Sequence, residues 1–281
     1  MVEVRYRSRL GNNLFQYCLG RILAEALGFA LEAKPIEGFP NTSATIAGAR
    51  YDEPEQVLTG QHIDIAGILN DRSPRRIVLD GHFQQIEYYR PHRASIREWL
   101  AFDRSALPAA NPRVCVHVRR TDYIRHGWAL PFSYYSEALE MVAPDGEEIW
   151  ITTDDPKDPF FERFAAWRPR FHRGSALEQM AFLSKTARLV ISQSTFAWWP
   201  AFLGEAKMVI CPDPSFGVWA DGGEFPGPKL LDHDRFTCIR CTETYRPTLP
   251  EAWHQQRRKL RRRAILRLNS LFRQSIPVPW D

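Results

Sequence analysis

The sequence has few of the features that mark a secreted or membrane-spanning chain. It contains five cysteines in 281 residues, an odd number scattered through apolar segments, which suits buried reduced thiols better than a disulfide framework. No run of about eighteen apolar residues occurs, and the N-terminal segment lacks the apolar core of a signal peptide. We therefore expect a cytoplasmic protein.

Several nucleotide- and metal-binding signatures are also absent. There is no GxxxxGK(S/T) loop, no GxGxxG after a candidate strand and no HExxH sequence. These absences argue against a P-loop nucleoside triphosphatase and weaken the case for a nicotinamide or flavin enzyme. A single CxxC, from Cys238 to Cys241, has no second pair nearby, so we favour a packing or surface role for it over zinc binding.

The net charge of +4 comes from one segment. Residues 255–276 hold eight Arg or Lys and no acid, so removing these eight charges leaves the rest of the chain at −4. The apolar residues of this segment share one helical face: Leu260, Ala264, Leu268 and Leu271, with Phe272 beside them. Such a helix suggests docking on an anionic membrane, here the inner face, and a solvated helix that packs on the body is an equal alternative. Nucleic-acid binding is disfavoured because the body is acidic.

Apolar runs alternate with helix-like spacings in the second half of the chain. Strands are expected at residues 113–118, 148–152, 188–192 and 207–211, with helices at 133–142, 159–167 and 176–187. The first half predicts strands at 2–6 and 76–81, a helix that ends near Gly28, a helix at 95–102 and a loop-rich stretch at 35–75. This alternation predicts an α/β protein with a parallel sheet. The best domain boundary is the proline-bearing stretch 103–112.

Charged and polar groups follow three of the predicted strands. Arg119, Arg120 and Asp122 come after the first, Asp154–Asp155 after the second, and Ser194–Thr195 after the third, ahead of a helix. Taken singly, these are a solvated strand end, a turn and a helix cap. Because the carboxyl ends of parallel strands share one edge of the sheet, together they offer guanidinium groups and a helix N-terminus to one ligand. A diphosphate requires that combination.

Four segments resemble the α1,2-fucosyltransferases of glycosyltransferase family 11. The first, His117–Asp122 (HVRRTD), matches the HxRRxD motif of the wider fucosyltransferase superfamily. The others are Leu10–Tyr17 (LGNNLFQY), Leu79–Tyr89 (LDGHFQQIEYY) and Ser192–Trp199 (SQSTFAWW). They occur in the family's order and span roughly residues 2–213.

The resemblance implies a GT-B-like fold, with two Rossmann-like domains facing each other across a cleft. We accordingly divide the chain into an acceptor-side domain at 1–108, a nucleotide-sugar domain at 109–250 and a basic amphipathic helix at 251–281. The implied reaction is an inverting transfer of L-fucose from GDP-β-L-fucose to a glycan hydroxyl, which is galactose O2 in this family, with another fucosyl linkage as an alternative. No cofactor or metal is expected, because guanidinium groups can neutralise the leaving diphosphate.

The same resemblance assigns residues on the nucleotide side. Arg119 would pair with the β-phosphate, and Arg120, His117 and Asp122 would shape that pocket. Asp154–Asp155 would line the ribose or base side.

The start of the last helix and the opposite domain complete this predicted set. Ser194, Thr195 and Phe196 would place donors at the phosphates. Asn12 would reach in from the other domain, and Arg9, which replaces a family glycine, would add a cation.

Two assignments are less determined by the sequence. Where the family has an Asp to read guanine, this chain has Glu178, which keeps another nucleotide-linked deoxysugar open as an alternative donor. Candidates for the general base are Asp122, His126 and Glu87, with His126 favoured instead as an exposed or acceptor-contacting residue. Residues 82–84 are expected to contact the acceptor or the fucose.

Overall fold

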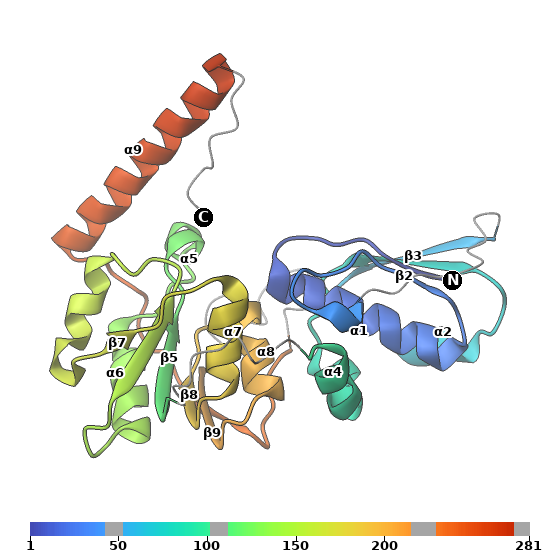
Figure 1. The fold of residues 1–281 in the computed structure, drawn as a ribbon, viewed down its shortest axis with the longest axis horizontal. Coiled ribbons are helices and arrows are strands. Elements are labelled where there is room, and N and C mark those ends of the chain that lie inside the picture. The colour runs from blue at the N-terminus through green and yellow to red at the C-terminus, as the bar shows by residue number, and fades with distance from the viewer. Residues whose placement is uncertain (43–52, 102–111, 215–228, 273–281) are drawn as a thin grey trace.

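A computed structural model describes residues 1–42, 53–101, 112–214 and 229–272 (Figure 1). The first sheet contains four parallel strands in the order β2-β1-β4-β3. Its strands are β1 (Val2–Val4), β2 (Leu31–Glu32), β3 (Glu55–Gly60) and β4 (Arg76–Gly81). The helices of this half are α1 (Leu10–Leu27), α2 (Ile65–Asn70), α3 (Ile86–Tyr89) and α4 (Arg93–Trp99), with 3-10 turns at Pro40–Thr42 and Arg90–His92.

The second sheet contains six parallel strands in the order β10-β9-β8-β5-β6-β7. Its strands are β5 (Val114–Val118), β6 (Ile149–Thr153), β7 (Arg170–Phe171), β8 (Arg188–Val190), β9 (Met208–Pro212) and β10 (Phe236–Ile239). Its helices are α5 (Thr121–His126), α6 (Phe132–Val142), α7 (Ala176–Ser184) and α8 (Thr195–Leu203), with the 3-10 helix η3 at Pro159–Trp167. The long helix α9 (Leu249–Phe272) follows and projects from this domain (Figure 1).

The predicted α/β class is confirmed, with two sheets of parallel strands. One local expectation is wrong. The segment 35–75 contains β3 and α2, and β3 was not predicted because it is an edge strand whose only buried side chain is Leu58. The helix expected at 159–167 is present with those bounds, as a 3-10 helix. The proposed boundary at 103–112 falls almost entirely on residues 102–111, outside the described residues.

The helix α1 joins the two halves of the core. It ends as predicted at Gly28, which has a left-handed backbone conformation with a φ of +68°. The Gly28 backbone N–H bonds to carbonyl oxygens in the last turn of the helix. Near its start, the Phe15 ring packs on Trp198 and Trp199 of α8, with ring centroids 4.9 and 4.6 Å apart. The Trp199 indole donates a 2.8 Å hydrogen bond to the Gly11 carbonyl. One hydrophobic cluster therefore spans both sheets and fixes the start of α1 against α8.

Candidate functional site

The register of β5 and β6 brings the predicted charged groups together. Val118 pairs with Thr153, so the residues that follow, Arg119 and Asp154, emerge side by side at the carboxyl edge of the sheet. The Arg119 Nη1 atom lies 3.1 Å from Asp154 Oδ2, and its Nε donates to Asp122 Oδ1 at 3.0 Å. Asp154 also accepts from the Arg120 backbone N–H at 2.8 Å and from the Thr121 hydroxyl. Both acids therefore hold the guanidinium in one orientation.

The electrostatics keep this cluster ionised. Burial alone would lower the pKa of Arg119, but Asp154 and Asp122 outweigh it and leave the pKa raised. Burial likewise acts to raise the pKa of Asp122, and the charges of Arg119 and Arg9 reverse this, so the net shift is downward. The Arg119 side chain is 16% exposed, so it is partly accessible to a ligand while solvent screening of its charge is limited.

Arg9 brings a second cation from the opposite domain. Its Nη1 lies 3.6 Å from Asp122 Oδ2, so Asp122 is a shared counter-ion for Arg9 and Arg119. Asn12, on the first turn of α1, accepts a 2.7 Å hydrogen bond from the Gln84 amide. Of the predicted first-domain residues, Arg9 therefore contacts the Arg119 cluster and Asn12 contacts the segment 82–84.

Two helix N-termini meet beside this cluster. The N-cap residues are Arg9 for α1 and Ser194 for α8, and neither side chain makes a capping hydrogen bond to its own helix. A Cβ atom built on Gly11 would lie 2.7 Å from the backbone of Thr195 and Phe196, so the two helix starts are in direct contact. Uncapped helix N-termini favour an anion through their free N–H groups and the helix dipole.

Arg120 occupies a different environment from its neighbour. Its side chain is fully buried, its Nε donates to Asp158 at 2.9 Å, and its guanidinium lies 3.9 Å from the Phe160 ring centroid and 4.3 Å from that of Tyr245. The Tyr245 hydroxyl accepts from Arg120 Nη2 at 2.7 Å. The buried contacts of Arg120 thus stabilise the loop that carries Arg119, and its charge is not presented at the protein surface.

His117 is also buried and is held uncharged. Its Nδ1 lies 2.9 Å from the Ser192 hydroxyl, and its ring packs 5.8 Å from Phe196. Burial, reinforced by the positive charge of Arg119, lowers the pKa of His117 to about 3. The imidazole is therefore neutral at physiological pH and serves as a hydrogen-bonding wall between β5 and the start of α8.

The depressed pKa of His117 should make folding acid-sensitive. As the pH falls from 6.5 towards 3, the unfolded chain protonates this imidazole and the folded protein does not, so stability drops across that window. Between pH 7 and pH 5 we expect wild type to lose about 2 kcal/mol more unfolding free energy than His117→Gln. Urea unfolding at both pH values measures this difference, and equal losses in the two proteins would contradict it. Burial also lowers the pKa of His82 and His172, but both are present in each protein.

Asp155 is covered by the terminal helix. It lies 2.9 Å from His254 Nε2 and is paired with Arg258, both on α9. Its predicted contact with the ribose or base therefore requires α9 to be part of the nucleotide-binding surface. The sequence did not predict this pairing, nor the contacts of Tyr245 and Asp158 with Arg120, because no local pattern links residues so far apart in the chain.

Two other predicted residues lie in local structures. Glu178 forms a capping box at the start of α7, where its carboxylate accepts from the Ser175 backbone N–H at 2.6 Å and the Ser175 hydroxyl accepts from the Glu178 N–H. That hydrogen bond lowers the pKa of Glu178. His126 is exposed at the end of α5 and stacks on Trp128 at 4.6 Å.

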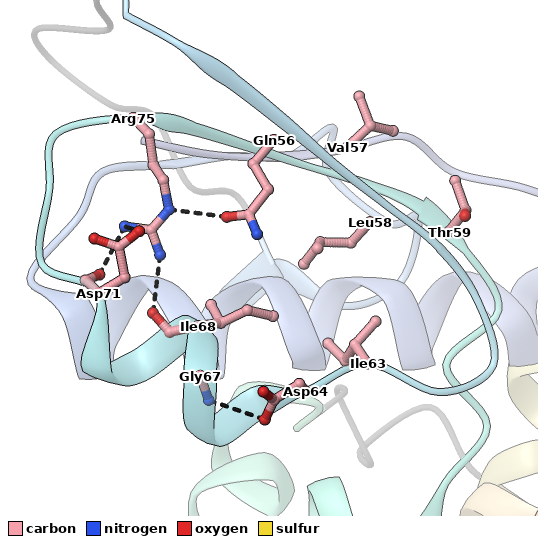
Figure 2. A pocket seen from close by; sticks show the side chains of 10 residues that line it. All are labelled: Gln56, Val57, Leu58, Thr59, Ile63, Asp64, Gly67, Ile68, Asp71 and Arg75. Carbon is pink, nitrogen blue, oxygen red and sulfur yellow. Dashed lines mark hydrogen bonds and ion pairs between the residues drawn. The ribbon is translucent and has the colours of Figure 1, made fainter.

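A cavity of about 310 Å³ lies in the other domain, between β3 and α2 (Figure 2). The arginine that lines it, Arg75, donates to the carbonyl oxygens of Ile68 and Asp71 and to the Gln56 side chain. Its guanidinium group is therefore already engaged by hydrogen bonds within the protein. This lining lacks the charge for a diphosphate. Within the described ranges, no three His, Cys, Asp or Glu side chains cluster as a metal site. Asp232 and Asp234, which have DxD spacing, lie 3.5 and 3.9 Å from Arg90.

One curated protein that resembles the chain is a glycosyltransferase. The O-antigen biosynthesis glycosyltransferase WbnK of Escherichia coli is 32% identical over 114 residues, which are 34% of this chain and 37% of that protein. The match thus spans well under half of this relative's length. No protein-family model matches the chain.

Two solved structures of fucosyltransferases align with the fold. NodZ α-1,6-fucosyltransferase soaked with GDP-fucose gives a TM-score of 0.47 at 14% identity, covering 76% of this chain and 95% of that chain. A mutant of Arabidopsis thaliana FUT1 in complex with GDP gives 0.44 at 14% identity, covering 83% and 76%. TM-scores below 0.5 mean that the folds superpose only in part, so the site has to be judged on its own residues.

Proposed function

We propose that this protein is an inverting glycosyltransferase that moves L-fucose from GDP-β-L-fucose to a glycan hydroxyl. The observation that carries the proposal is the position of Arg119. It stands at the carboxyl edge of a parallel sheet, oriented by Asp122 and Asp154, beside Arg9 and two uncapped helix N-termini. The HxRRxD match and the resemblance of three further segments to family 11 support the choice of a fucosyl donor and of galactose O2 as acceptor.

The chemistry follows from where charge develops. As the bond between the sugar C1 and the phosphate oxygen breaks, negative charge grows on the leaving GDP while the sugar becomes cationic. A fixed guanidinium at that oxygen stabilises the transition state more than the ground state, which is the condition for catalysis. Two guanidinium groups and helix N-termini supply the neutralisation that other transferases take from a metal, so the proposal includes none.

Groups for the acceptor side come from the first domain. The His82 ring lies 3.2 Å from the Ser8 hydroxyl, and Gln84 donates a hydrogen bond to Asn12; both contacts support a position for these residues beside the proposed diphosphate site. Among the proposed bases, Asp122 is weakened by its ion pairs with Arg119 and Arg9. A glycan linked to a lipid is the acceptor that best suits the basic terminal helix.

A transferase of another nucleotide-linked deoxysugar is the second candidate. The observation that favours it is the capping box of Glu178, because a carboxylate already bound by the Ser175 N–H is poorly placed to read the N1 and N2 donors of guanine.

Thermal unfolding with different nucleotides separates the two candidates. We expect GDP at 100 times its dissociation constant to stabilise the protein by about 2.7 kcal/mol, seen as a rise in Tm, while UDP, ADP and CDP at the same concentration give little shift. Equal stabilisation by another diphosphate would favour the second candidate. No stabilisation by any of the four would contradict a nucleotide-sugar transferase.

A further inference from the structure

The first turns of α9 contact the body through one side of the helix. The Glu251 carboxylate, which is 1% exposed, accepts from Arg163 Nε at 2.8 Å and from the Tyr245 hydroxyl at 2.9 Å. One and two turns further on, His254 and Arg258 contact Asp155. Beyond them the helix extends away from the domain (Figure 1). None of the helices in the described ranges is long and apolar enough to cross a membrane.

The side of α9 that faces away from the body is apolar and exposed. Four large side chains on it are 85%, 71%, 56% and 41% exposed: Leu249, Trp253, Leu260 and Leu268. At about 100° per residue, these four fall within an arc of about 100°. The residues that contact the body, Glu251, His254, Gln255 and Arg258, lie outside that arc, as does one further leucine, Leu266, which is 47% exposed. Exposed apolar side chains gathered on one face of a helix mark an interaction surface.

The charges on α9 identify the partner. The helix carries seven basic residues: Arg257, Arg258, Lys259, Arg261, Arg262, Arg263 and Arg267. Its one acidic residue, Glu251, is buried in its pairing with Arg163. Arg257 and Arg267 fall within the apolar arc, where a long side chain can lay its methylene groups along an apolar surface and keep its charge at a phosphate.

We propose that the outer face of α9 docks on an anionic membrane surface. Apolar side chains reach the boundary of the acyl chains, and the flanking arginines pair with lipid phosphates, which is the pattern of interfacial helices. A second copy of this chain is a poorer partner, because two such helices would bring fourteen like charges together, twice the seven counted above. A nucleic acid would leave Trp253 and the leucines without a role. This inference does not depend on the proposed function.

Docking through this face would also set the position of the candidate site. The body-facing side of α9 holds Asp155, which directly follows Asp154 in the Arg119 cluster, and Glu251 holds Tyr245 against Arg120. The first turns of α9 therefore fix the membrane-facing helix to the loops around the candidate site. An acceptor presented at the membrane surface would meet the site in a fixed orientation.

Vesicle co-sedimentation of the full chain tests the proposal. We expect binding to vesicles of phosphatidylcholine mixed with phosphatidylglycerol to exceed binding to phosphatidylcholine alone by at least about tenfold. The triple variant Trp253→Gln, Leu260→Gln, Leu268→Gln keeps good helix formers and should lose at least about tenfold in binding. The matched control Val57→Gln, Met141→Gln removes apolar side chains that are 45% and 42% exposed elsewhere and should bind as wild type does.

Three outcomes would overturn the proposal. One is triple-variant binding equal to wild type, with circular dichroism showing both folded. Another is a dimer in sedimentation velocity without lipid that the triple variant converts to monomer, which would assign the face to a second copy. The third is no vesicle binding together with RNA binding that survives the triple substitution. Because none of these readouts involves nucleotide or transfer activity, failure here is distinguishable from failure of the proposed function.

Discussion

Replacing Arg119 with lysine is expected to lower the rate of fucosyl transfer by about 10²–10³-fold, equivalent to about 3–4 kcal/mol of lost transition-state stabilisation. The guanidinium is anchored by Asp122 through Nε and Nη2 and by Asp154 through Nη1. An ammonium is a point charge on a flexible stem and cannot satisfy both carboxylates while facing a phosphate oxygen. Charge is retained in this variant, so the loss reports on geometry.

The measurement is kcat for transfer from GDP-fucose to a galactoside, with GDP affinity taken from calorimetry on the same protein. Arg170→Lys is the matched control, because Arg170 pairs with Glu148 at 3.1 Å in the same domain but is 62% exposed. It should leave both quantities unchanged. Near wild-type turnover in both Arg119→Lys and Arg119→Ala would rule out the mechanism. Unchanged GDP binding with lost turnover would show that Arg119 stabilises the transition state and contributes little to GDP affinity.

The fold was predictable where strands are buried on both faces. Cys115 and Val116 in β5 and Leu189 and Val190 in β8 are fully buried, so their segments read as continuous apolar runs. β3 has the opposite character, since it is an edge strand with mostly exposed side chains, and nothing in its composition separates it from a loop. Trp198 and Trp199 are buried in the core, which is the usual place for a large aromatic pair on a helix.

The candidate site was predictable only in part, because sequence places residues along a strand but does not say which way their side chains point. Arg119 and Arg120 are adjacent, yet one lies at the surface of the site and the other is fully buried between aromatic rings. The partner that decides this, Tyr245, is 125 residues away. The family resemblance assigned Asp155 to the nucleotide, and its pairing with α9 depends on a helix that packs on it from the far end of the chain.

Gly11 is a residue whose role the sequence did not explain and the structure does. The LGNN segment was identified by resemblance, but the sequence gives no physical reason for a glycine on the first turn of a helix, where it costs stability. The structure supplies the reason, since the starts of α1 and α8 touch at this position and Trp199 bonds to the Gly11 carbonyl. A side chain there would separate the two domains at the candidate site.

Gly11→Ala is therefore expected to impair both stability and nucleotide binding. The new Cβ atom would lie 2.7 Å from Thr195 C and Phe196 N, and backbone atoms cannot turn aside as a side chain can. Overpacking of this kind costs about 1–3 kcal/mol, which denaturant unfolding would detect. The shift moves Arg9 and Asn12 away from Arg119, so we expect GDP affinity to fall by about tenfold or more.

Gly20→Ala, on the same helix, separates the two effects. Its Cβ would meet the Val4 side chain at 2.5 Å and those of Leu31 and Leu79 at 3.3 and 3.4 Å, inside the first domain. We expect a comparable loss of stability with GDP affinity unchanged, because nothing at the contact between α1 and α8 moves. If Gly11→Ala lost stability but bound GDP as tightly as Gly20→Ala, the first domain would contribute nothing to nucleotide binding, and Arg119 would have to hold the diphosphate with its own domain alone.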